Sequence, residues 1–110
     1  MKLFTATVAL TTLVLSPLAW ANECKADGTI SDIGYHITVP RSDIVDPDGL
    51  CGGFKTNIQR WILCRPKHWH CGMEGAEFKA DFRVGSQCNA GMIGSSWYEQ
   101  TKNQYGSISC

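Results

Sequence analysis

Residues 78–84, Phe-Lys-Ala-Asp-Phe-Arg-Val, decide the fold, because apolar and charged side chains alternate along them without a break. This period of two predicts a strand with one buried and one solvated face. The same alternation over residues 35–39 predicts a second strand, and residues 69–73 and 107–110 are shorter candidates. The chain therefore has four expected strands.

Helical periodicity separates these strands in two places. The first helix is expected to end at Arg65, because a residue before proline leaves the helical region. Its apolar residues recur mostly three or four positions apart, which predicts one buried face; they are Leu50, Phe54, Ile58, Trp61 and Ile62. The second helix is expected to open at Asn89, to carry Trp97 on its apolar stripe and to end at Gly106.

The order strand, helix, strand, strand, helix, strand predicts an α+β fold. We expect a disulfide-stapled βαββαβ sandwich of the ferredoxin-like split βαβ type, with two helices on one four-stranded antiparallel sheet. Right-handed crossovers place both helices on one face and give the spatial strand order 4-1-3-2.

Six cysteines predict a disulfide framework, because a short exported chain buries too little apolar surface to be stable without covalent links. They are Cys24, Cys51, Cys64, Cys71, Cys88 and Cys110. The expected sheet places Cys24 beside Cys110, and the turn into the second strand places Cys64 beside Cys71. Cys51 is then left to pair with Cys88.

The N-terminal residues have the three parts of a secretion signal. A positively charged start is followed by an apolar run over residues 3–15, and residues 19–21 (Ala-Trp-Ala) match the pattern that a signal peptidase cleaves. The apolar run is shorter than the ~20 residues that a membrane-spanning helix needs. We therefore expect a signal peptide over residues 1–21 and a single cysteine-rich α+β domain over residues 22–110, secreted to the extracellular space.

The charges of the chain balance, with ten basic and ten acidic residues. A neutral protein has no broad field to attract phosphates or anionic lipids, although a local site is still allowed. No glycine-rich phosphate loop follows an expected strand, so no cofactor is expected. We expect a monomer whose partner is a protein or another cell-surface target.

A zinc site is one alternative, because Cys64, His68, His70 and Cys71 have the residue types and spacing of tetrahedral ligands. The competing interpretation pairs both cysteines in disulfides and leaves the histidines on an exposed turn, as an oxidising compartment favours. We expect the disulfides and no metal.

Acid–base catalysis is a second alternative. The residue set is His36, His70 and Arg83 with Glu74 or Glu77, which supplies a base, an acid and a cation for phosphodiester cleavage. His36 and Arg83 share the polar face of the sheet if their strands pair, although such faces are usually only solvated. No serine nucleophile motif occurs. We expect no enzymatic activity and assign no catalytic residue; a ribonuclease-like protein is the alternative.

Aromatic side chains offer a recognition surface. Trp61 and Trp97 fall on helical stripes and are expected in the core, whereas two other aromatic residues are expected to be exposed. A stapled domain presents such residues rigidly, which lowers the entropy lost on association. The candidate binding residues are Trp69, His68, His70 and Tyr98.

In layout the chain resembles the small cysteine-rich effectors secreted by filamentous fungi. The likeness consists of the signal ending at residues 19–21, a short mature region, six cysteines and the terminal Cys110. The expected βαββαβ order is also similar to the α/β-sandwich killer toxins carried by viruses of smut fungi. Residues 69–71, Trp-His-Cys, resemble the aromatic-x-Cys triplet of powdery-mildew effectors, many of which are similar to inactive ribonucleases. These resemblances imply a virulence or toxin-like protein that binds a host or competitor target without catalysis.

Overall fold

The computed structural model describes residues 21–110. Two strands, a helix, two more strands and a second helix follow one another along the chain: β1 Glu23–Thr29, β2 Asp32–Val39, α2 Pro47–Gln59, β3 Lys67–Glu74, β4 Glu77–Val84 and α3 Ala90–Thr101. The signal peptide expected over residues 1–21 lies outside the described residues except for Ala21. Within residues 21–110 no helix is long and apolar enough to cross a bilayer.

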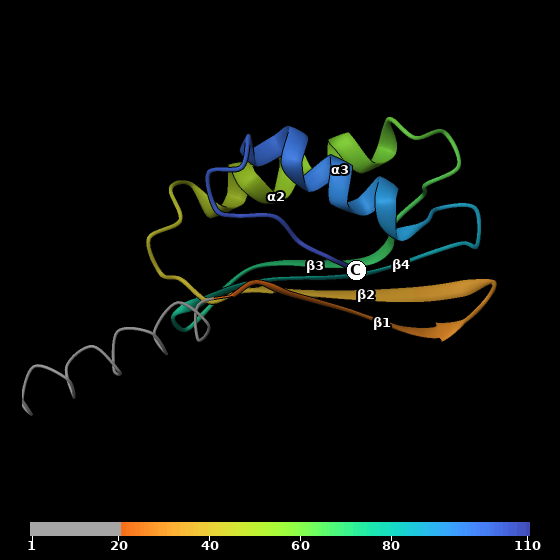
Figure 1. Ribbon diagram of the computed structural model, residues 1–110, viewed down its shortest axis with the longest axis horizontal. Helices are drawn as coiled ribbons and strands as arrows, with labels where there is room; N and C mark the ends of the chain where they lie inside the picture. Colours follow the sequence, from red (N-terminus) through yellow and green to blue (C-terminus); the bar gives the residue numbers. More distant parts are fainter. Residues whose placement is uncertain (1–20) are drawn as a thin grey trace, which may run out of the picture.

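Both helices lie on one face of a four-stranded sheet, whose strands run in the order β1-β2-β4-β3 with each neighbouring pair antiparallel (Figure 1). This arrangement confirms the expected layers, two helices on one four-stranded antiparallel sheet. The central pair is β2 and β4, in which His36 lies opposite Asp81 and Ile37 opposite Ala80. The sheet therefore has one covered face and one open face.

The alternation that predicts the strands also fills the core. Apolar residues of β4 point toward the helices, and the charged residues between them lie on the open face. The buried ones are Phe78, Ala80, Phe82 and Val84. Phe54 of α2 packs edge-on against Trp97 of α3, with the ring centroids 5.3 Å apart. Full burial of a Phe side chain stabilises a fold by about 1.5–3 kcal/mol, so these contacts hold both helices on the sheet.

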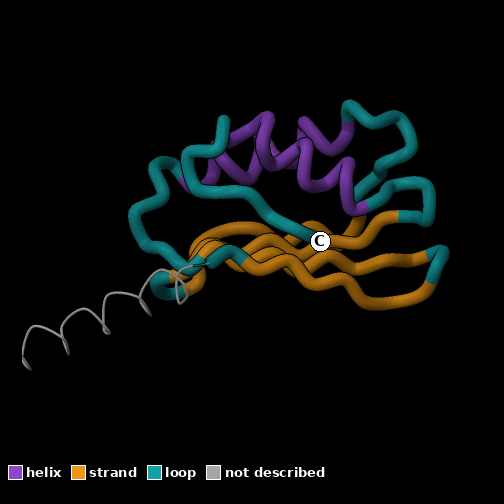
Figure 2. The backbone as a smooth tube through the Cα atoms, in the orientation of Figure 1, coloured by secondary structure: helices purple, strands orange, loops and turns teal. Residues whose placement is uncertain are grey.

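The fourth strand comes from the N-terminal side of the domain, which corrects both the expected βαββαβ order and the strand expected over residues 107–110. β1 pairs with β2 and occupies the edge of the sheet, giving the order ββαββα instead of split βαβ connections. Residues 107–110 form no strand; they run back from α3 toward the sheet (Figure 2), where Cys110 bonds to Cys24. β1 has exposed side chains on both faces, so its sequence lacks the apolar alternation that predicts a strand.

Three disulfides staple the domain, which fits an extracellular protein. The expected Cys24–Cys110 pair is confirmed. The other two expected pairs are wrong: the structure joins Cys51 to Cys71 and Cys64 to Cys88. The reason is that α2 packs against β3, which brings Cys51 of the helix over Cys71 of the strand.

α2 is shorter than its apolar periodicity predicts. It begins after Asp46, whose side chain accepts a hydrogen bond from the Gly49 N–H at 3.2 Å. It ends at Gln59 instead of Arg65. The disulfide from Cys64 to Cys88 draws the chain out of the helix toward the loop before α3, and the last part of the apolar stripe falls in a turn.

Candidate functional site

An apolar turn between α2 and β3 stands out on the surface. Three consecutive residues are exposed there: Trp61 by 40%, Ile62 by 80% and Leu63 by 54%. We call these three residues the apolar tip. The expectation that Trp61 belongs to the core is wrong, because the helix that would have buried it ends before it.

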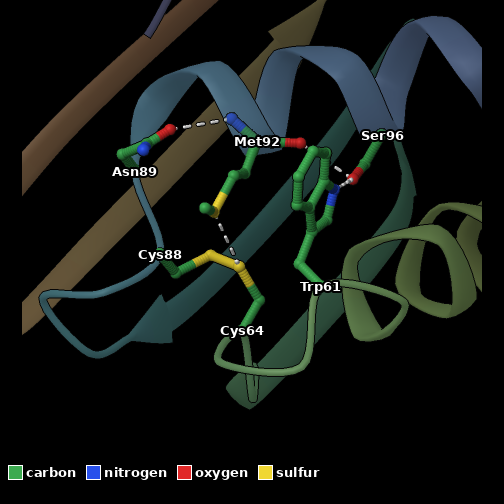
Figure 3. The surroundings of a disulfide bond; sticks show 6 residues. All are labelled: Trp61, Cys64, Cys88, Asn89, Met92 and Ser96. Atoms are coloured by element: carbon green, nitrogen blue, oxygen red, sulfur yellow. Dashed lines mark hydrogen bonds between the residues drawn. A yellow bond between two sulfur atoms is a disulfide. The ribbon is translucent and has the colours of Figure 1, made fainter.

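The base of the apolar tip is fixed to α3 and to the loop before it (Figure 3). The Trp61 Nε1–H donates to Ser96 Oγ at 3.2 Å, and the Ser96 hydroxyl donates to the Met92 carbonyl at 2.8 Å. The Cys64 N–H donates to the Trp61 carbonyl at 2.8 Å and closes the turn. Cys64 itself is buried and bonded to Cys88. The turn is therefore held at both ends while its apolar side chains face solvent.

A hollow of about 170 Å³ adjoins the indole of Trp61. It lies between α2 and α3 and is lined by Asn57, Arg60, Trp61, Ser95, Ser96 and Glu99. Glu99 accepts a hydrogen bond from Lys102 Nζ, which is the main cause that lowers the pKa of this carboxyl, and Arg60 adds a minor attraction. Arg60 is thus near Glu99 without forming an ion pair with it in the part of the chain that the structure describes.

The residues expected to bind on β3 point to different sides of the sheet. Trp69 stacks on Phe82 in the core layer with the ring centroids 5.0 Å apart, and the ammonium of Lys55 lies 5.6 Å from its ring centroid. Trp69 is accordingly half-buried instead of freely exposed. His70 lies opposite Asp81 on the open face, and His68 is exposed at a bulge with a φ of 54°.

Tyr98 is 52% exposed on α3, as the sequence predicts. It belongs to the helical layer, whereas His70 lies on the open face of the sheet, so the structure does not bring the expected binding residues into one patch. The apolar tip was missed because helical periodicity continued through it. The one signal in the sequence that points to it is the run of three apolar residues before Cys64.

A group of charged residues lies on the open face of the sheet. We call it the charged face, and its residues are Asp27, Asp32, His36, Asp81 and Arg83. The two ring nitrogens of His36 lie 2.7 Å from Asp81 Oδ1 and 2.9 Å from Asp27 Oδ2. The hydrogen bond with Asp81 is the largest cause that raises the pKa of His36; burial opposes it, and Asp27 adds to the rise. Both ring nitrogens donate only when the imidazole is protonated, so this geometry suits the cation.

Arg83 is also bound within the charged face. Its Nε–H donates to Asp32 Oδ2 at 3.1 Å and one Nη2–H donates to the Asp32 carbonyl at 3.0 Å. Gly34 lies opposite Arg83, and a Cβ there would come within 2.8 Å of an Arg83 nitrogen and 2.5 Å of Asp27 Oδ1. The missing side chain of Gly34 therefore leaves the space in which the two ions meet.

The residue set considered for phosphodiester cleavage is only partly brought together. His36 and Arg83 share the open face, as the pairing of their strands predicts, and His70 lies there too, because it and His36 are both opposite Asp81. Glu74 and Glu77 lie opposite each other beside the β3–β4 turn, and Glu77 is six residues from Arg83 along β4, about 20 Å. The two glutamates therefore lie apart from His36 and Arg83, which they were expected to assist.

The zinc alternative loses its sulfur ligands. Cys64 and Cys71 form disulfides with different partners, so neither supplies a thiolate. His68 and His70 then lack the neighbouring cysteines that made the spacing suggestive. Residues 21–110 contain no group of three or more His, Cys, Asp and Glu side chains arranged to hold a metal ion.

Comparison of the chain with protein-family models, curated proteins and solved structures gives no match.

Proposed function

We propose that the protein is a secreted, non-enzymatic binding protein of the effector or killer-toxin kind, which recognises a host or competitor cell through the apolar tip. The observation that carries the proposal is the exposure of three consecutive apolar side chains on a turn held by a disulfide. Burying these exposed apolar side chains against a target is favourable, because it removes apolar surface from water. The turn has already lost most of its conformational freedom, which lowers the entropy lost on binding.

The ribonuclease-like alternative has one observation in its favour, the open face that His36 and Arg83 share with His70. Three carboxylates surround His36 and Arg83 at hydrogen-bond or ion-pair distance. His36 and Arg83 are therefore already engaged by carboxylates of the chain and are not free to stabilise the transition state of a phosphodiester. The binding function is therefore favoured.

Binding to intact cells tests the proposal. We would label the oxidised protein, recovered from the medium of a secreting host and checked by intact mass, and measure its binding to yeast cells and to plant protoplasts. Ile62→Ser removes the most exposed side chain of the apolar tip. Ile30→Ser is the control, because Ile30 is 85% exposed in the β1–β2 turn, at the opposite edge of the sheet from β3, the strand that follows the apolar tip.

We expect saturable binding to at least one cell type, a loss of about tenfold or more with Ile62→Ser, and no change with Ile30→Ser. Equal losses with the two substitutions would mean that general surface hydrophobicity causes the binding. No saturable binding, together with RNA cleavage that His36→Ala abolishes, would reject the proposal in favour of the ribonuclease-like alternative.

A further inference from the structure

We infer that the target of the apolar tip is the lipid bilayer itself: the tip inserts into the interfacial region of an anionic membrane, and neighbouring cations contact the lipid headgroups. This inference rests on the proposed function, since it names the target of the same residues. It differs from recognition of a protein receptor, which the test below separates from it.

The first support is a segregation of charge that the neutral total conceals. Residues 49–73 carry four basic residues and no acidic residue, whereas residues 21–48 carry six acidic and two basic residues. The apolar tip lies inside the basic segment. A local basic region is attracted to an anionic surface even when the whole chain is neutral.

The second support is the position of the cations around the apolar tip. Arg60 precedes the tip directly, and Arg65 and Lys67 follow it within a few residues. All three are exposed, and none of them forms an ion pair with a residue between 21 and 110. Asp48 begins the same helix that ends before Arg60, about 18 Å away along its axis. Arg60 lies near Glu99 beside the hollow, so Arg65 and Lys67 are the cations free to contact phosphate or carboxylate groups outside the chain.

The third support is the size and shape of the exposed apolar group. Three side chains at the end of a turn present far less than the ~800 Å² that each partner buries in a standard protein interface. They suffice for shallow insertion, because Trp favours the membrane–water interface while aliphatic side chains enter the acyl boundary. Stable attachment to a membrane needs two signals, and the apolar tip and its flanking cations supply both.

Binding to vesicles of defined composition tests this inference. We would measure co-sedimentation of the processed protein with vesicles of phosphatidylcholine alone and of phosphatidylcholine containing about one third phosphatidylserine. Processed protein is needed because the apolar run over residues 3–15 would itself associate with lipid. Tryptophan emission is a second readout, because Trp97 is buried and Trp69 is stacked on Phe82, which leaves Trp61 to report insertion by a blue shift.

Matched substitutions separate the apolar and the electrostatic contributions. Ile62→Ser removes insertion and keeps the cations, with Ile30→Ser as its control. Arg65→Gln removes one flanking cation, and Lys25→Gln removes an exposed cation of β1 outside the basic segment.

We expect binding to the phosphatidylserine vesicles and not to phosphatidylcholine alone, weakened by salt. Ile62→Ser should lower the affinity about tenfold or more and abolish the blue shift. Arg65→Gln should lower it about fivefold, and the Ile30 and Lys25 variants should bind as the unmodified protein does.

Absence of binding to the anionic vesicles would overturn the inference, as would equal loss with Ile62→Ser and Ile30→Ser. If the protein binds cells through the apolar tip but not vesicles, and protease treatment of the cells removes that binding, the target is a protein. In that case the proposed function stands and the lipid inference fails. If neither cells nor vesicles bind the protein, both fail.

Discussion

The charged face and the apolar tip both meet solvent, and they differ in how far the chain itself satisfies their groups. On the charged face His36 and Arg83 each contact two carboxylates. At the apolar tip three apolar side chains are exposed, and the arginines on either side form no ion pair with residues 21–110. The charges of the first region are paired within the folded chain, although Asp32 Oδ1 is buried there without a hydrogen-bond partner. The second region has exposed apolar groups and cations that only another molecule can satisfy.

Exposed groups that have no partner within the chain are stronger candidates for function than clusters whose charges are already paired. A cluster of titratable side chains suggests chemistry, but the ion pairs of the charged face link β1, β2 and β4 to one another. An anchored turn with exposed apolar groups has no such internal role. Substitutions confined to one of the two regions show whether the other region responds.

The largest effect is expected for β1, the strand that carries Asp27 of the charged face, from removing the disulfide that closes the longest loop. Cys24→Ser with Cys110→Ser opens a link between residues 86 positions apart, which should lower the free energy of unfolding by about 4–5 kcal/mol. β1 should detach first, because its other contacts are the ladder to β2 and the ions of the charged face. Hydrogen exchange would measure this order of opening. Opening of the apolar tip before β1 would contradict it.

Removing the disulfide beneath the apolar tip should have a smaller effect on stability and a larger effect on binding. Cys64→Ser with Cys88→Ser opens a link of 24 positions, which should lower the free energy of unfolding by about 3 kcal/mol. Denaturant titration measures the change in the free energy of unfolding. The folded fraction of the double variant should also bind cells more weakly than the unmodified protein. Unchanged binding would show that the disulfide is not needed to present the tip.

A single hydrogen bond below the apolar tip gives the next effect. Ser96→Ala leaves the Trp61 indole N–H without its acceptor and should lower the free energy of unfolding by about 1–2 kcal/mol. Trp61 should become more mobile, which fluorescence anisotropy would detect. Ser95→Ala is the matched control, because Ser95 lines the same hollow and is exposed; it should change neither quantity.

The smallest effect concerns the pH dependence of the charged face. The pKa of His36 is raised in the folded protein, so its stabilisation is present below the ordinary value of 6.5 and is lost as the pH rises through the folded value. His36 is largely solvent-screened, so the difference should stay below about 1 kcal/mol. Raising the pH from about 5 to about 8 should lower the free energy of unfolding more for the unmodified protein than for His36→Gln. Equal losses would contradict the ion pairs of His36.

The sequence allowed most of the fold to be predicted. The strands over residues 35–39, 69–73 and 78–84 and both helices follow from periodicity, because one face of each has to be buried. β1 could not be found in this way, since its side chains are exposed on both faces and backbone pairing with β2 defines it. The disulfide pairing beyond Cys24–Cys110 also depended on how α2 lies over β3, which no local pattern encodes.

The candidate site was harder to predict than the fold. Trp61 and Ile62 continue the apolar spacing of α2, and their exposure follows from the early end of the helix near Cys64. Residue type alone makes the histidines and Trp69 candidates for binding, although the sheet places Trp69 and His70 on opposite faces. The charge segregation was present in the sequence, because residues 49–73 have no acidic residue, and the neutral total concealed it.

The most direct test is to measure cell binding and unfolding free energy for Ile62→Ser and His36→Gln side by side. We predict that Ile62→Ser loses binding about tenfold or more while its stability stays within ~0.5 kcal/mol of the unmodified protein. His36→Gln should lose its pH-dependent stability and retain binding. The opposite result, binding lost with His36→Gln and retained with Ile62→Ser, would place the function on the charged face and contradict this account.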